Sequence, residues 1–123
     1  MSELRLLAGR FAVCRLAVDA RVPEWAAGDF SSVTRTPDEL SAVCREDAVP
    51  DGVKCERGWR VFQVAGPLEF SLTGVLAAIA GPLADAGVSI FAISTFDTDY
   101  VLVKDEVLAK AVEALKGAGH RVS

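Results

Sequence analysis

The chain has 123 residues and a mass of 13.0 kDa, the size of one ordinary domain or two very small ones. Hydrophobic residues make up 51% and charged residues 24% of it, which is typical of a folded protein and excludes an intrinsically disordered one. The net charge is −4, from 13 basic and 17 acidic side chains, and the arginines are scattered along the chain. This charge disfavours nucleic acid and anionic membranes as partners.

The composition also predicts a cytoplasmic location. Three arginines interrupt the segment from Met1 to Leu16, which therefore lacks the apolar run of a secretory signal. The longest uncharged run, residues 70–84, is shorter than the roughly 20 residues of a membrane helix. Cys14, Cys44 and Cys55 are odd in number and have no C-x-x-C spacing, which predicts free thiols in a reducing compartment. Cys14 and Cys44 lie in apolar stretches and are predicted to be small core residues.

In the first half, short apolar and β-branched runs alternate with turn residues, which predicts strands joined by short connections. A short segment with Pro23 at its start and Gly28 at its end predicts a short helix. The strands are predicted at residues 4–7, 11–16, 30–35 and 40–45, the last two forming a hairpin around residues 36–39. Residues 46–58 are charged and contain the turn signal Pro50-Asp51-Gly52, so we place the boundary between two halves there.

The second half shows a clearer pattern. Apolar residues from Leu72 to Ala86 recur at helical spacing, with Pro82 inside the pattern predicting a kink. The nearly continuous apolar run at residues 88–94 predicts a central strand covered by helices. Asp105 is expected to cap a last helix. The remaining strands are predicted at residues 59–64, 100–103 and 121–122, and the last helix carries an apolar stripe over residues 107–115.

This order is βαββαβ, so we predict an α+β protein with a ferredoxin-like fold. The first half follows a shortened form of the same order, and the predicted units are residues 1–57 and 58–123. An internal repeat supports this, because two segments of the first half match two of the second at one constant separation. The turn at 36–38 matches the turn at 95–97, and residues 42–46 match residues 101–105. The alternative is that two unrelated hairpins resemble each other.

The sequence contains no catalytic motif, no cofactor-binding motif and no metal-ligand spacing, which favours a non-catalytic protein without cofactors. His120 is the single histidine and lies near the C-terminus, where we expect it to be solvated. A metal site at Asp97 and Asp99 is disfavoured.

One segment nevertheless favours ligand binding. Ser71 or Thr73 can cap the helix that follows, and the amides of Gly74 and Val75 would have no helical acceptor. Such a helix start attracts an anion, for instance a carboxylate. The turn at residues 95–99 follows the second strand of the ferredoxin-like order, where Asp99 could accept hydrogen bonds from a cation. An anion site beside a cation site suits a zwitterion, and an ordinary capped helix is the alternative.

The segments at residues 70–76 and 87–103 resemble the ACT domain, in particular the bacterial ACT proteins related to CASTOR amino-acid sensors and to aspartokinase regulatory domains. Residues 30–41 are similar to the N-terminal half of that group, so the resemblance covers nearly the whole chain. It implies tandem ACT-like units with a shortened first unit. It also implies an amino-acid ligand contacted by the loop into the first helix and by the turn after the second strand. At these positions the chain has Phe70, Ser71, Leu72, Thr73, Gly74, Val75, Thr95, Phe96 and Asp99.

The resemblance implies an amino-acid-binding regulatory module with its ligand at a site between ACT units. The eukaryotic sensor holds more ACT units than this chain, so a homodimer is expected. Its first-helix loop is also more acidic, which disfavours arginine as the ligand here. In the internal repeat, Leu40 stands at the position of Asp99 and Pro37 at that of Phe96, so we expect at most one such site per chain. The alternative is a ligand-free interaction or dimerisation module that regulates a separate enzyme.

Overall fold

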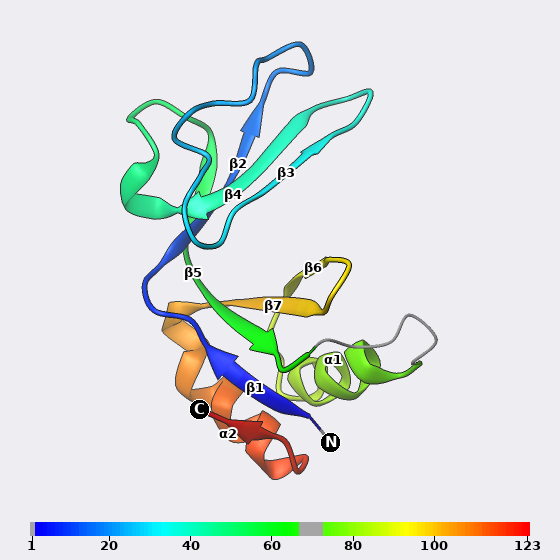
Figure 1. Ribbon diagram of the computed structural model, residues 1–123. Helices are drawn as coiled ribbons and strands as arrows, with labels where there is room; N and C mark the ends of the chain where they lie inside the picture. Colours follow the sequence, from blue (N-terminus) through cyan, green and yellow to red (C-terminus); the bar gives the residue numbers. More distant parts are fainter. Residues whose placement is uncertain (1, 67–72) are drawn as a thin grey trace. The chain divides into compact units, whose positions relative to one another are not determined.

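The computed structural model describes residues 2–66 and 73–123 (Figure 1). The chain divides into two compact units. The N-terminal unit is Gly9–Trp59, and the C-terminal unit combines Met1–Ala8 with Arg60–Ser123. The predicted halves therefore differ from these units mainly in the segment before Gly9, because its strand pairs with strands of the C-terminal unit.

The C-terminal unit is a mixed sheet with two helices. Its strands are β1 (Glu3–Leu6), the second half of β5 (Cys55–Val64), β6 (Phe91–Ser94), β7 (Asp99–Lys104) and β8 (Arg121–Val122), and its helices are α1 (Val75–Asp85) and α2 (Leu108–Gly117). From β5 onward the order is βαββαβ, which confirms the ferredoxin-like fold. The sheet order is β8-β1-β5-β7-β6, so the N-terminal strand β1 is inserted between β8 and β5.

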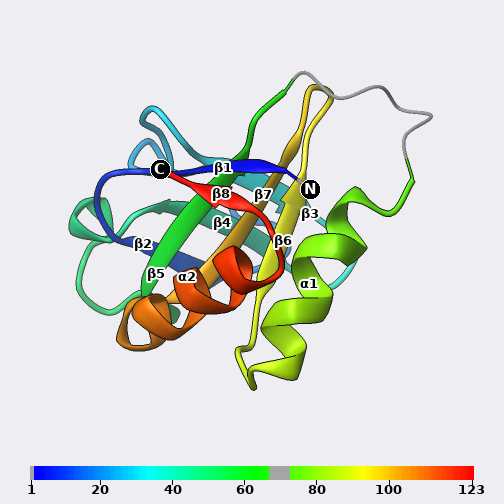
Figure 2. The ribbon, with the colours of Figure 1, turned by 90° about the horizontal axis from the view of Figure 1, so that it is seen from below.

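The core of this unit lies between the sheet and the helices, which pack on the same face (Figure 2). Phe62 and Val64 of β5 and Val101 and Val103 of β7 alternate along their strands, so one face of each strand is apolar. Their fully buried partners on the helices are Ile79, Leu83, Ala111 and Leu115. Burying these side chains is the main contribution to the stability of the unit.

The prediction of a central strand at residues 88–94 was wrong. The strand β6 begins only at Phe91 and pairs, within the described residues, with β7 alone, so it lies at an edge. The apolar run is explained by the connection before it, where Val88 is buried and Ile90 packs against the core. The apolar run at residues 88–94 therefore corresponds to a loop with apolar residues packed on the core, followed by a short edge strand.

Two of the predicted capping residues, Thr73 and Asp105, do not cap a helix, and a third, Ser71, lies outside the described residues. The residue before α1 is Gly74, with a φ of 80°, and no described side chain caps that helix, so Thr73 does not. Asp105 does not cap α2, because it opens a short 3₁₀ turn, η2 (Asp105–Val107), and Val107 precedes the helix. The carboxylate of Asp105 instead accepts a hydrogen bond from Nη1 of Arg60 at 3.1 Å.

The expectation that His120 is solvated was wrong as well, and Pro82 explains why. His120 is only 5% exposed. Its Nδ1 accepts a hydrogen bond from the amide of Ser2 at 3.0 Å, so Nε2 carries the proton and donates to the carbonyl of Ala78 at 2.8 Å. In a regular helix that carbonyl would accept from the amide of residue 82, which a proline lacks. His120 thus supplies the donor that Pro82 removes from α1.

The N-terminal unit is a smaller sheet. Its elements are β2 (Phe11–Leu16), β3 (Ser32–Arg35), β4 (Leu40–Arg45), the 3₁₀ turn η1 (Glu46–Ala48) and the first half of β5, in the sheet order β3-β4-β2-β5. The helix predicted at residues 23–28 is absent from this unit, all of which the structure describes. A single turn stands there, closed by the amide of Ala26 donating to the carbonyl of Pro23, because so short a segment does not sustain a helix nucleus.

The internal repeat is confirmed by the two hairpins. The bounds of β3, β4 and η1 are separated from those of β6, β7 and η2 by the same number of positions in every case. The registers match in the same way: Ser32 pairs with Val43, and Phe91 pairs with Leu102. The first unit lacks a helix between its first two strands, so it is the shortened one.

Candidate functional site

The start of α1 has the features expected of an anion site. Gly74 is in the left-handed region that a side chain disfavours, and a Cβ built on it would meet nothing within 4 Å. The first turn has no acidic residue, and the described residues provide no side-chain cap. Among the described residues no side chain accepts a hydrogen bond from the amides at this end, where the positive end of the helix dipole also lies. Thr73 and Gly74 are exposed and Val75 is half-buried.

The turn between β6 and β7 is fixed to the end of β5. The amide and the hydroxyl of Thr95 both donate to the carbonyl of Thr98, at 2.9 and 3.1 Å. Thr98 is buried, and its hydroxyl donates to the carbonyl of Val64 at 2.7 Å. The end of β5 and the β6–β7 turn accordingly lie at the same end of the sheet (Figure 2). The same turn carries Phe96, which is 78% exposed.

Asp99 lies at the start of β7, opposite Ser94. Its Oδ1 accepts a hydrogen bond from the Ser94 hydroxyl at 2.6 Å, which orients the carboxylate. None of the ion pairs among the described residues involves Asp99. An oriented carboxylate without a protein cation can accept hydrogen bonds from a ligand ammonium group.

Six predicted site residues thus fall within the described residues, at the start of α1 and in or beside the β6–β7 turn. Phe70, Ser71 and Leu72 lie outside the described residues. Sequence reasoning missed Ser94 and Thr98, which hold Asp99 and the turn in place. The hairpin pairing could have indicated Ser94, since the residues that flank a short turn face each other across it.

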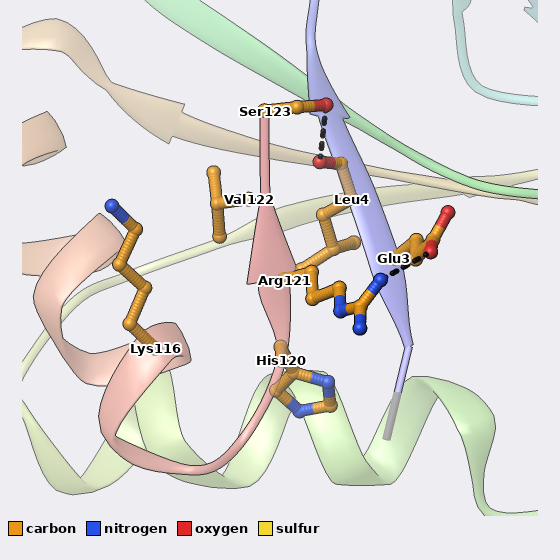
Figure 3. Close-up of a pocket in the computed structure, with 7 residues that line it drawn as sticks. All are labelled: Glu3, Leu4, Lys116, His120, Arg121, Val122 and Ser123. Carbon is orange, nitrogen blue, oxygen red and sulfur yellow. Dashed lines mark hydrogen bonds and ion pairs between the residues drawn. The ribbon is translucent and has the colours of Figure 1, made fainter.

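Two surface hollows lie elsewhere in the C-terminal unit, and no predicted site residue lines either. One, of about 570 Å³, is lined by Glu3, Leu4, Lys116, His120, Arg121, Val122 and Ser123 (Figure 3). In it Nη1 of Arg121 lies 3.3 Å from the carboxylate of Glu3, and His120 points down to α1. The other, of about 320 Å³, borders Arg5, Gln63 and Ala65. In the first hollow, Arg121 and Glu3 are engaged with each other and both ring nitrogens of His120 are engaged with backbone groups, so these side chains serve the packing of the chain.

The described residues contain no group of three or more His, Cys, Asp or Glu side chains that could hold a metal ion. Within the described part of the chain, no helix has the length and apolar character needed to cross a membrane. Cys14 and Cys44 are buried free thiols, as predicted, and Cys55 is partly exposed.

The match to a family model decides the family. The model of the ACT domain matches residues 54–117, about half of the chain. The chain belongs to the ACT domain family. A second model, of an N-terminal domain, matches residues 9–52, nearly the extent of the N-terminal unit.

Known relatives of this ACT protein include a bacterial structure and a vertebrate sensor. A crystal structure from Agrobacterium tumefaciens is 40% identical, with a TM-score of 0.94 over 99% of this chain and 92% of that one. The human protein named cytosolic arginine sensor for mTORC1 subunit 1 is 42% identical over 59 residues, which are 47% of this chain and only 18% of the sensor. The regulatory subunit of aspartate kinase from Thermus thermophilus shares the fold, with a TM-score of 0.65 at 14% identity over 94% of this chain and 96% of that one.

Proposed function

We propose that this chain is a non-catalytic, amino-acid-binding regulatory module that acts as a homodimer in the cytoplasm. The ligand is a small amino acid, held at a site between ACT units of two copies. The observation that supports this most is that the C-terminal unit has both a helix start at Gly74 without a side-chain cap from the described residues and the oriented carboxylate of Asp99. The first would receive the ligand carboxylate and the second its ammonium group.

The relatives support the same kind of function. One is named as an arginine sensor and another is a regulatory subunit of aspartate kinase. A small amino acid is proposed over arginine because the loop before α1 has no acidic residue after Glu69 to meet a guanidinium group. Regulation then requires that the ligand bind one arrangement of the module more tightly than another.

The test is a thermal-shift screen against the proteinogenic amino acids, followed by calorimetry. A ligand at 100 times its dissociation constant stabilises the folded state by about 2.7 kcal/mol, which is a shift of several degrees. Asp99→Asn keeps the size of the side chain and is expected to weaken binding at least about tenfold, the loss of one charge-assisted hydrogen bond. Asp97→Asn, in the exposed turn just before β7, is the matched control and should leave binding unchanged. A flat screen, or equal effects of the two variants, would contradict the proposal.

The edge strand β6 favours a second candidate, a ligand-free interaction module. The amide of Thr95 donates to the carbonyl of Thr98, so these two residues form a hydrogen-bonded pair of the hairpin. Hydrogen-bonded and non-hydrogen-bonded pairs alternate along antiparallel strands. Three positions further along the hairpin, Ala92 and Val101 therefore form a non-hydrogen-bonded pair. The amide of Ala92 therefore points away from β7, where a strand of a partner could bind it.

Ala92→Pro tests this candidate because it removes an outward donor and leaves the β6–β7 hydrogen bonds in place. Loss of dimers in sedimentation, with unchanged amino-acid binding, would favour the interaction module. Ile93→Pro is the contrasting variant, since it removes a donor inside the hairpin and should destabilise the unit itself. If Ala92→Pro leaves the dimer intact, β6 is not the pairing edge.

A further inference from the structure

The three cysteines of the chain gather in one apolar cluster of the N-terminal unit. Cys14 on β2 is opposite Cys55 on β5, and both pack in the same apolar cluster as Cys44 of β4. Cys14 is 1% exposed and Cys55 is partly exposed.

The strand register selects one pair of thiols. The amide of Arg15 donates to the carbonyl of Lys54 at 2.9 Å, so Arg15 and Lys54 are opposite each other as a hydrogen-bonded pair. The neighbouring pair, Cys14 and Cys55, is then a non-hydrogen-bonded one, in which the Cα atoms lie about 4.5 Å apart. Disulfides span Cα separations of about 4.4 to 6.8 Å, so this pair can be bridged without moving the backbone.

The same register excludes Cys44 from that bridge. On β2 and β4, Cys14 is opposite Ala42 and Cys44 is opposite Ala12, which makes Cys14 and Cys44 diagonal neighbours. Diagonal positions are about 7 to 8 Å apart, and Cα atoms more than about 7 Å apart cannot be joined. Cys44 therefore serves as an internal control in the same cluster.

We propose that Cys14 and Cys55 form a reversible redox site, oxidised by a peroxide to a disulfide between β2 and β5. Cys55, which is partly exposed, loses its proton to solvent, and its thiolate attacks one peroxide oxygen. The O–O bond breaks, Cys55 becomes a sulfenic acid, and the hydroxide that leaves takes up a proton as water. The Cys14 sulfur then attacks the Cys55 sulfur, the S–O bond breaks, and the departing hydroxide takes the Cys14 proton as water. Two thiols lose two electrons in total, and the peroxide is reduced to two waters.

The environment of the two thiols fits these roles. Burial raises the pKa of Cys14 to about 12, with the neighbouring Cys55 and Cys44 thiols adding to the shift. Cys14 is therefore kept protonated and shielded from the oxidant, and Cys55 provides the oxidant's entry. The raised pKa slows attack by Cys14, and its fixed position opposite Cys55 offsets this by proximity. In a reducing compartment such a disulfide is transient, as in redox sensors.

The experiment treats the purified chain with hydrogen peroxide, then counts free thiols and maps linked peptides by mass spectrometry. The expected result is the loss of two of the three thiols and a Cys14–Cys55 linked peptide, both reversed by a dithiol reductant. Cys44→Ala is the matched control and should still lose two thiols. Cys55→Ala, at the partly exposed position, should abolish the linkage, and Cys14→Ala should leave Cys55 as a sulfenic acid or further oxidised.

Each other outcome overturns the proposal. These are a link that includes Cys44, a link between two chains, oxidation of Cys55 beyond the sulfenic acid in the unaltered chain, or no loss of thiols at all. Circular dichroism of each variant separates a lost linkage from a lost fold. The result is independent of amino-acid binding, so failure here leaves the proposed function untouched.

Discussion

His120→Ala should destabilise helix α1, because Pro82 leaves the carbonyl of Ala78 without a backbone donor and His120 supplies the donor in its place. His120→Ala removes the donor to the Ala78 carbonyl and the acceptor for the Ser2 amide, and it empties a buried position. Each lost hydrogen bond costs about 1 kcal/mol, and with the lost packing the unfolding free energy should fall by about 2 to 3 kcal/mol.

A double-mutant cycle with Pro82→Ala isolates the helix contact. An alanine at position 82 restores a backbone donor to the Ala78 carbonyl, so His120→Ala then leaves only the Ser2 amide without a partner. We expect His120→Ala to cost about 1 kcal/mol less in that background, which is the coupling energy of the pair. At this chain length such a difference corresponds to about 3 to 5 °C in Tm.

The assay is urea unfolding of the four proteins of the cycle, followed by circular dichroism at one pH. Equal m-values, the slopes of the unfolding free energy against urea concentration, would show that the four proteins expose the same surface on unfolding. If the two substitutions are additive within about 0.3 kcal/mol, His120 does not replace the missing donor and the reasoning is refuted.

Two further predictions concern the N-terminal unit. Gly9→Ala should lower the unfolding free energy by about 1 to 2 kcal/mol, because the φ of Gly9 is +89° and the new Cβ, 2.6 Å from Cζ of Arg45, would push that guanidinium from its place over the Phe11 ring. Gly52→Ala, at a φ of +88° with open space around it, is the control and should cost less; equal losses in chemical unfolding would contradict the clash. The raised pKa of Cys14 means that the folded state holds that proton more tightly than the unfolded state, with a pKa of about 12 against 9.0. The unfolding free energy should therefore fall between pH 9 and 12, by at most about 1.4 kcal/mol per pH unit, and less steeply in Cys14→Ala; parallel pH profiles of the two proteins would argue against it.

Local patterns determined most of the secondary structure. The bounds of β2 and β4 agree with the sequence prediction, because both strands are apolar runs that end at turn residues. The internal repeat predicted the equivalence of the two hairpins, since the same turn chemistry at Thr36 and Thr95 closes both. The ligand-binding role of Asp99 and its neighbours remains a prediction.

Pairing between distant segments could not be predicted in the same way. The sequence of residues 3–6 predicts a strand, but only the folded chain places it between β8 and β5. The apolar run at residues 88–94 is compatible with a central strand or with a buried loop and an edge strand, and sheet order decides between them.

The sequence by itself therefore determined the fold class, the repeat and the resemblance to the ACT family, because periodicity and turn residues act over a few positions. Only the tertiary structure decided the environment of individual polar groups. His120 is far along the chain from the helix carbonyl it serves, and Cys14 is equally remote from the thiol opposite it. Such contacts depend on sheet order and register. These are set by the burial of the whole core rather than by residues close together in the sequence.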